Sequence, residues 1–139
     1  MKKITQAILI LSFVFSSGVF GQAATTIVIS QVYGGGGNTG APYTNDFIEL
    51  FNPTSSAADL TGWSVQYATA TGSTWTNITP LSGILASGAY LLIQESGGAN
   101  GSPLPTPDIT GTIVMAATAG KVALCNSTTA LTTCPTGGN

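Results

Sequence analysis

Residues 45–53 read Asn-Asp-Phe-Ile-Glu-Leu-Phe-Asn-Pro, and this stretch decides the fold. Side chains alternate across a β-strand, so a strand over Asp46–Phe51 directs Ile48 and Leu50 to one face and the residues between them to the other. We expect Ile48 and Leu50 to face the core. Pro53 ends the strand, because proline donates no hydrogen bond to a sheet and turns its predecessor away from regular structure.

Working outward from this strand, the rest of the chain predicts further strands separated by turns. The segments are rich in β-branched and aromatic residues, which favour strands, and glycine and proline interrupt them. No segment spaces its apolar residues as a capped helix would. Strands at this spacing are typical of an all-β sandwich. The expected strands are Thr25–Tyr33, Asp46–Phe51, Trp63–Ala68, Thr74–Ile78, Tyr90–Gln94, Thr110–Met115 and Lys121–Cys125, with loops at Gly34–Gly40, Leu81–Gly88 and Gly97–Asp108.

Composition limits both the class of protein and its partners. The 139 residues suit one domain, and 43% hydrophobic against 6% charged residues excludes a solvated disordered chain. Lys2, Lys3 and Lys121 are the only cations, and there is no arginine or histidine. We therefore expect no nucleic acid binding by this segment, because it lacks a basic surface.

The first 23 residues have the pattern of an export signal. Lys2 and Lys3 precede an apolar run over residues 7–15, and Gly21-Gln22-Ala23 offers small residues for a signal peptidase. The apolar run is too short to span a membrane with ease. We expect residues 1–23 to be removed, residues 24–139 to form one domain, and the product to be secreted or periplasmic with no other membrane contact.

An exported chain can form disulfides, and this one has two cysteines. Cys125 and Cys134 are joined by a turn-rich connection that could bring them together. Sequence does not fix the connectivity, so a Cys125–Cys134 bond, two unpaired thiols and partners beyond Asn139 all stay open.

Asp46 to Pro53, followed by Asp-Leu-Thr-Gly-Trp-Ser-Val from residue 59, resembles the lamin tail domain, and most closely its bacterial exported branch. The resemblance extends from Thr26 to about Gly137. It implies an immunoglobulin-like antiparallel β-sandwich. The residues that carry it, all expected to be structural, are Asp46, Ile48, Glu49, Leu50, Asn52, Pro53, Leu60, Gly62 and Trp63.

Three residues of the second motif have separate expected roles. Gly62 is expected where the turn needs a positive φ or a close backbone approach. Leu60 should pack beneath that turn. Trp63 is expected in the core, where its large side chain buries much apolar area, and the alternative is an exposed platform for a ligand.

The resemblance also has a departure. Members of this family usually continue with at least one more strand, of a Val-Asp-Leu-Val-Gly-Tyr-Gly type, whereas residues 134–139 read Cys-Pro-Thr-Gly-Gly-Asn. We expect either a fragment of a longer product or a sandwich that lacks its last strand. An open sheet edge of that kind invites association with a strand of another chain.

Groups for catalysis are scarce. Without histidine there is no imidazole base, and Asp46 and Glu49 should face opposite sides of their strand. We expect no catalytic residue, cofactor or metal. A calcium site, which needs six or more oxygens, would require two long loops to meet. The residues for that alternative are Asn38, Asn45, Asp46 and Asp108, and those for a loop-built binding rim are Tyr33, Tyr43, Trp75 and Pro103–Pro107.

These observations predict a non-catalytic module of an exported protein, used for adhesion, targeting or contact between domains. Its partner would be an unidentified protein or a cell surface. The alternative, which the resemblance suggests, is the N-terminal accessory domain of an exported metal-dependent nuclease or phosphatase-type enzyme. The catalytic domain of that enzyme would lie beyond Asn139.

Overall fold

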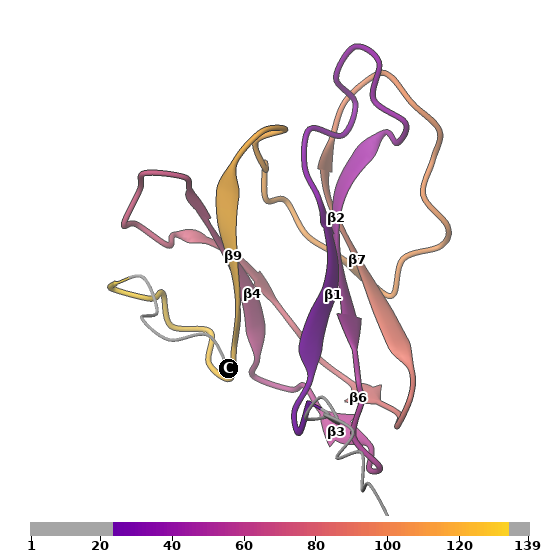
Figure 1. The fold of residues 1–139 in the computed structure, drawn as a ribbon, viewed down its shortest axis with the longest axis vertical. Helices are drawn as coiled ribbons and strands as arrows, with labels where there is room; N and C mark the ends of the chain where they lie inside the picture. The colour runs from indigo at the N-terminus through magenta and orange to yellow at the C-terminus, as the bar shows by residue number, and fades with distance from the viewer. Residues whose placement is uncertain (1–23, 134–139) are drawn as a thin grey trace, which may run out of the picture.

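The computed structural model describes residues 24–133, which form strands joined by turns and loops (Figure 1). No helix occurs in this part of the chain. Between Ala24 and Thr133 there is therefore no helix that is long and apolar enough to span a membrane. The strands are β1 (Val28–Tyr33), β2 (Asn45–Phe51), β3 (Ala58–Asp59), β4 (Ser64–Thr69), β5 (Asn77–Pro80), β6 (Ile84–Leu85), β7 (Tyr90–Gly97), β8 (Ile109–Thr110) and β9 (Gly120–Cys125).

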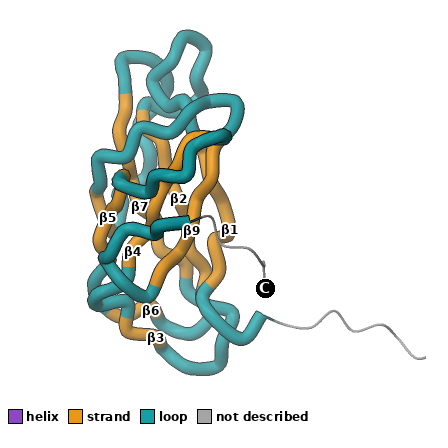
Figure 2. Tube along the Cα trace, turned by 90° about the vertical axis from the view of Figure 1, so that its left-hand side faces the viewer, coloured by secondary structure: helices purple, strands orange, loops and turns teal. Residues whose placement is uncertain are grey.

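Two main sheets form the two layers of a sandwich. One sheet has four strands in the order β1-β2-β7-β8, and the other has three in the order β5-β4-β9. Strands β3 and β6 pair with each other at one end (Figures 1 and 2). All strand pairs are antiparallel except β7 with β8. The prediction of an all-β sandwich is confirmed.

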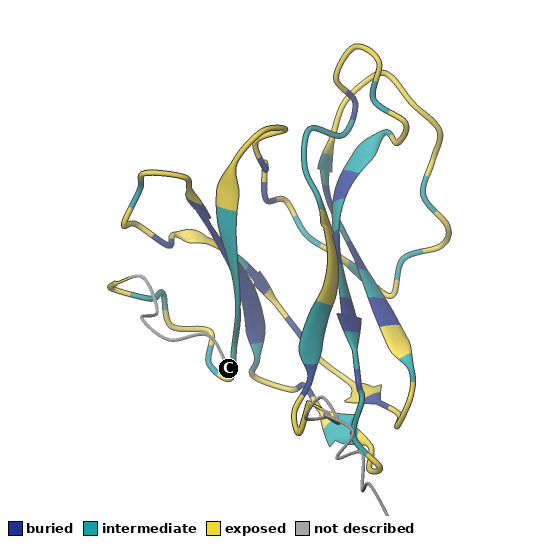
Figure 3. Cartoon of the chain, viewed as in Figure 1, coloured by how far each residue is buried: buried dark blue, intermediate teal, exposed yellow. Residues whose placement is uncertain are grey.

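Strand β2 lies between β1 and β7 in the four-stranded sheet. Its residues alternate between buried and half-buried (Figure 3). Ile48 and Leu50 are fully buried. They pack with the facing sheet in one cluster, which removes apolar surface from water and supplies the main driving force for folding. The cluster comprises Ile27, Ile48, Leu50, Leu60, Val65, Tyr67, Leu81, Leu85, Leu91, Ile93, Ile113 and Met115.

Three predicted segments differ from the structure. The expected loop Leu81–Gly88 contains β6, which pairs with β3; two-residue strands are too short to show an alternating pattern. Only Thr110 of the expected strand Thr110–Met115 belongs to a strand, because β8 ends there. The strand expected at Thr74–Ile78 begins only at Asn77, where pairing with β4 starts.

Residues 111–119, between β8 and β9, cross from one sheet to the other and contribute side chains to the core without forming a strand. We call them the crossing segment. Ile113 and Met115 are each 3% exposed, whereas Val114 between them is 69% exposed. This alternation is what led the sequence to predict a strand there. The backbone N–H groups of Ile113 and Met115 donate to side-chain carboxylates on other strands. They do not donate to the backbone of a neighbouring strand.

Strand β4 is buried on both faces. Val65 and Tyr67 face the core, and Ser64 and Gln66 on the opposite face are also buried. The segment after β9 covers that second face through three hydrogen bonds. Ser64 Oγ donates to the Ser127 carbonyl, Gln66 Nε2 donates to the Thr129 carbonyl, and Gln66 Oε1 accepts from the Leu131 N–H.

The turn before β4 follows its expected design in two of three residues. Gly62 has a φ of 83°, a conformation that residues with a Cβ rarely adopt. Leu60 is fully buried, and its carbonyl accepts a hydrogen bond from the Trp63 N–H. Trp63 is half-buried and packs against the core. The largest fully buried side chain is instead Trp75, which sequence reasoning had placed on a surface rim.

Candidate functional site

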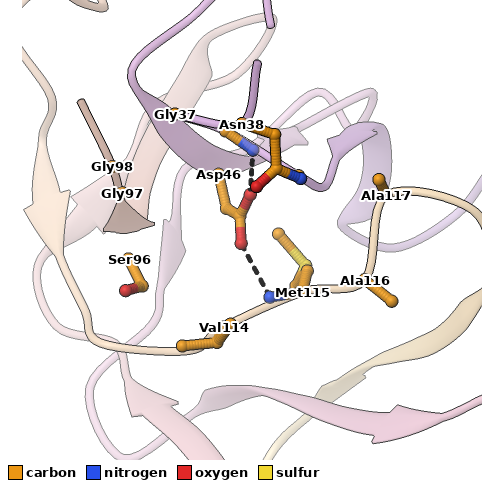
Figure 4. Close-up of a pocket in the computed structure, with 12 residues that line it drawn as sticks. Gly37, Asn38, Asp46, Ser96, Gly97, Gly98, Val114, Met115, Ala116 and Ala117 are labelled. Atoms are coloured by element: carbon orange, nitrogen blue, oxygen red, sulfur yellow. Dashed lines mark hydrogen bonds between the residues drawn. The ribbon is translucent and has the colours of Figure 1, made fainter. Parts of the chain in front are cut away.

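A glycine-walled hollow of about 250 Å³ lies at the end of the sandwich where the Gly34–Gly37 loop meets the crossing segment. Asp46 forms part of it, and its carboxylate is only 2% exposed. Asp46 Oδ1 accepts a 2.6 Å hydrogen bond from the Gly36 N–H, and Oδ2 accepts one of 2.7 Å from the Met115 N–H (Figure 4). The side chain thus joins the glycine loop to the crossing segment.

Glycine is required along the walls of this hollow by close approach. A Cβ on Gly36 would lie 2.1 Å from the Asn45 carbonyl carbon, and one on Gly37 would lie 2.1 Å from the Gly98 Cα. These contacts would force the backbones apart. The glycine run is therefore a closely packed part of the fold, although the sequence predicted it only as a loop.

A second buried acid, Glu95 on β7, lies near Asp46. Glu95 is 1% exposed, and its Oε2 accepts a 2.9 Å hydrogen bond from the Ile113 N–H. Its Oε1 has no hydrogen-bond partner among the described residues, and neither does the buried hydroxyl of Thr79. Burial raises the pKa of Glu95, and the nearby Asp46 charge raises it further; the nearby Thr79 hydroxyl and the bond from the Ile113 N–H oppose this. The Thr79 hydroxyl is thus close enough to act on the carboxyl, although its geometry is too poor for a full hydrogen bond.

Sequence reasoning missed Glu95 because it compared Asp46 only with Glu49. Asp46 and Glu49 do lie on opposite faces of β2, as predicted. Position along each strand could have revealed the pair. Asp46 has the same parity as Ile48, and Glu95 has the same parity as Ile93, so both acids point inward from neighbouring strands.

The two acids anchor the crossing segment. Each carboxylate accepts a hydrogen bond from a backbone N–H of that segment: Glu95 from Ile113, and Asp46 from Met115. Hydrogen bonds between backbone N–H groups and carboxylates are among the stronger ones in proteins. The pair therefore holds the chain segment that leads from β8 to β9, and its geometry supports a structural role.

Replacing Glu95 with glutamine should stabilise the fold at neutral pH. The amide carbonyl can still accept from Ile113, and the amide nitrogen can donate to Thr79 without the cost of a buried charge. We expect a gain of about 1–3 kcal/mol in the free energy of unfolding at pH 7, the usual cost of an unpaired buried polar group. Chemical denaturation of both proteins measures it.

The stabilisation by E95Q should depend on pH. The folded-state pKa of Glu95 is raised above its ordinary value of 4.5. Its protonated form therefore favours folding, and this contribution is present below about pH 4.5 and is lost as the pH rises through the folded-state pKa. The gain in the free energy of unfolding that E95Q gives should therefore increase as the pH rises from about 4.5 through the folded-state pKa. An advantage that is equal at pH 4 and pH 7 would contradict the assignment.

The residues proposed for a calcium site do not converge. Asn38 and Asp46 border the hollow, but Asn45 Nδ2 donates to the Glu95 carbonyl, and Asp108 Oδ2 accepts from the Leu92 N–H. Between Ala24 and Thr133, no group of three or more histidine, cysteine or acidic side chains could hold a metal ion. Backbone groups engage the side chains of Asn45, Asp46 and Asp108 at separate places, so the geometry does not support the calcium alternative.

The outer face of the four-stranded sheet carries two groups of aromatic rings. Tyr33 stacks on Phe47 with ring centres 5.4 Å apart, and Tyr43 meets both rings edge-on at 5.6 and 5.9 Å. Further along the same face, Phe51 stacks on Tyr90 at 4.6 Å. Tyr90 is 59% exposed and Tyr43 is 38% exposed. We call these five residues the aromatic face.

Polar groups lie between the two aromatic groups. Glu49, on the same side of β2 as Phe47 and Phe51, accepts hydrogen bonds of 2.5 Å from Ser30 Oγ and 3.3 Å from Gln31 Nε2. Its ladder partner Leu92 is half-buried on the same face. The face is thus apolar at both ends and polar in the middle.

The structure divides the predicted rim. Tyr33 and Tyr43 belong to the aromatic face, and the loop that contains Pro103 and Pro105 starts beside Tyr43, since Thr44 N–H donates to the Ser102 carbonyl. Trp75 is only 2% exposed and does not belong to the rim.

Trp63 borders a second hollow, of about 400 Å³, between β9 and the segment that covers β4. Leu124, Leu131 and Cys125 line it as well. Burial raises the pKa of the Cys125 thiol. The proposed partner Cys134 and the export signal of residues 1–23 lie outside the described residues.

The two layers and their strand order define a small immunoglobulin-like β-sandwich. The lamin tail domain family matches residues 21–137 of the chain. The chain belongs to this family, whose domain is a non-catalytic immunoglobulin-like module. Neither a curated protein nor a solved structure matches the chain.

Proposed function

We propose that this domain is a binding module of an exported bacterial protein. Through the aromatic face, it attaches that protein to a protein partner or to the cell surface. The single observation that carries the proposal is the exposure of Tyr43 and Tyr90 among packed rings on the outer face of the four-stranded sheet. Tyr90 is 59% exposed and stacked on Phe51, so the ring is held in place while its other surface faces solvent.

Rigid aromatic side chains suit recognition. Tyrosine offers a large apolar surface with a polar tip and loses little conformational entropy when it binds. Aromatic residues are enriched in the buried centres of interfaces, where a few of them supply most of the binding energy. The mutual packing of Tyr33, Tyr43 and Phe47 already fixes their positions.

Export is part of this proposal. The positive start, the apolar run over residues 7–15 and the small residues at 21–23 support a cleaved signal and a secreted or periplasmic product. The alternative proposal places the domain as an accessory part of a longer exported nuclease or phosphatase-type enzyme. The same aromatic face would then contact either the catalytic domain or the surface to which the enzyme is directed.

Binding to envelope material of the producing cells tests the function. A Tyr43→Ser/Tyr90→Ser double variant should bind at least about tenfold more weakly, because hot-spot tyrosines commonly carry 1–2 kcal/mol or more each. Val114→Ser is the matched control, since Val114 is 69% exposed and borders the glycine-walled hollow, not the aromatic face. Cosedimentation of the purified proteins with the envelope fraction measures the change.

Equal binding of the double variant and the control would overturn the proposed surface. Turnover of an ester, glycan or nucleic acid by the purified domain would overturn the proposed class of function. Both variants change exposed side chains, so thermal unfolding should show that each still folds.

A further inference from the structure

An acidic side chain lies in the middle of the aromatic face. Glu49 is flanked along β2 by Phe47 and Phe51, and all three point to the same side of the strand. The hydrogen bonds that its carboxylate accepts from Ser30 and Gln31 both end on Oε1. Among the described residues, none donates to Oε2. This oxygen is therefore able to accept a hydrogen bond from a partner that covers the face.

The charges around this acid are mostly negative. A second acid, Asp108, is exposed and forms two hydrogen bonds with the backbone of Leu92, the residue opposite Glu49 in the sheet. In the range 24–133, Lys121 is the one basic side chain, and it lies on β9 in the other sheet. The strands that carry the aromatic face thus contain acids and no base. A partner with positive charge complements such a surface, and an anionic polymer is repelled by it.

Tyr90 supplies a surface on which a cation can stack. One side of its ring packs against Phe51, and the residue is 59% exposed. In the register of the sheet Phe51 is the partner of Tyr90, and Glu49 is the partner of Leu92, so Glu49 is the diagonal neighbour of Tyr90. Diagonal neighbours lie about 7–8 Å apart, within reach of a long side chain. One cationic group can therefore lie over the tyrosine ring and bond the carboxylate.

We propose that the aromatic face binds a basic segment of a protein, whose arginine side chains stack on the tyrosines and bond Glu49. The guanidinium group is planar and always charged, and it both stacks on aromatic rings and donates hydrogen bonds to carboxylates. A neutral glycan would also cover the rings, but it would leave the charge of Glu49 without a counter-charge once water is excluded. This inference rests on the proposed function, because it names the chemistry of the partner for the same surface.

The two groups of rings set the spacing of the arginines. Phe47 and Phe51 belong to different groups and lie four residues apart on β2. Four residues of a strand span about 13 Å. An extended peptide with arginines four residues apart covers the same distance with both side chains on one side. Such a segment reaches both groups of rings.

Two synthetic peptides test the proposal. The first is rich in glycine and serine and has two arginines four residues apart. The second has citrulline at both positions, which keeps the shape of arginine without its charge. Fluorescence anisotropy with the purified protein should show at least about tenfold tighter binding of the arginine peptide, because stacking and carboxylate contacts both gain from the charge. Added salt should weaken that binding by screening the charges.

Protein variants locate the peptide. Glu49→Gln keeps the shape of the side chain and removes its charge, so it should weaken binding of the arginine peptide about threefold to fivefold. Its affinity should also depend less on salt. Asp59→Asn is the matched control and should bind as the unchanged protein does, since Asp59 is an exposed acid on β3, outside the four-stranded sheet. Thermal unfolding shows that each variant folds, and the comparison of the two peptides needs no variant.

Equal binding of the arginine and citrulline peptides, or an unchanged affinity of E49Q for the arginine peptide, would overturn the proposal. Cosedimentation with the envelope fraction separates this failure from failure of the proposed function. If E49Q sediments as the unchanged protein does and Tyr43→Ser/Tyr90→Ser does not, the aromatic face binds a neutral partner such as a glycan, and only the recognition of positive charge is wrong. If both sediment as the unchanged protein does, the proposed function is wrong as well.

Discussion

Replacing Trp75 with alanine is expected to lower the free energy of unfolding by about 3–5 kcal/mol, the usual loss for a buried aromatic side chain. Trp75 is 2% exposed and is the largest of the fully buried side chains, so its removal leaves a cavity that its neighbours cannot fill. Urea denaturation followed by circular dichroism measures the difference.

Trp63→Ala is the matched control for this prediction. Trp63 is half-buried and borders a hollow, so its removal takes away less buried surface and leaves less empty space. We expect a loss of about 1–3 kcal/mol, in proportion to the smaller apolar area involved. A loss for Trp63→Ala that equals or exceeds that for Trp75→Ala would show that the motif tryptophan is the true core anchor, as the sequence suggested.

Replacing Asp46 with alanine is expected to lower the free energy of unfolding by about 3 kcal/mol or more. The change removes two hydrogen bonds to a charged group, each worth about 1.5–3 kcal/mol, and leaves two backbone N–H groups without acceptors. The groups are the N–H of Gly36 and that of Met115. Denaturant unfolding at pH 7 measures the effect, and hydrogen exchange at both amides should speed up.

Two variants serve as controls for Asp46→Ala. Asp46→Asn keeps one acceptor and the shape of the side chain, so it should cost less. Glu49→Ala removes an acid from the same strand, but Glu49 lies on the outer face and accepts from the side chains of Ser30 and Gln31. A loss for Glu49→Ala as large as that for Asp46→Ala would contradict the anchoring role.

The strands with strong alternation could be predicted from the sequence. Strand β2 follows from Ile48 and Leu50, and the turn before β4 follows from Gly62, because hydrophobic burial and backbone sterics act locally there. The two-residue strands β3 and β6 could not be predicted, since they depend on two distant turns meeting. The same limit applies to Trp75, whose flanking residues are polar and give no sign of burial.

The candidate sites were predicted in part. Tyr33 and Tyr43 were expected on a binding rim, and they contact each other there, but the contribution of Phe47 and of the Phe51–Tyr90 pair depends on strand register. The acid pair was missed because it joins neighbouring strands that are far apart in sequence. The face on which a residue lies can be assigned from the alternation in its own strand. To predict that two residues on different strands lie together, the order of the strands in the sheet must also be known.

The anchoring by Asp46 also bears on how quickly the chain folds. Its bond to Met115 joins residues 69 positions apart, and the Glu95 bond to Ile113 closes a further loop. Folding rates fall as the average sequence separation of contacts rises, because long loops must lose entropy before their contacts form. These two bonds hold the segment that precedes β9 in the chain, and β9 then pairs with β4. We therefore expect folding on the millisecond-to-second scale typical of β-sandwiches, with the pairing of β9 as a late event.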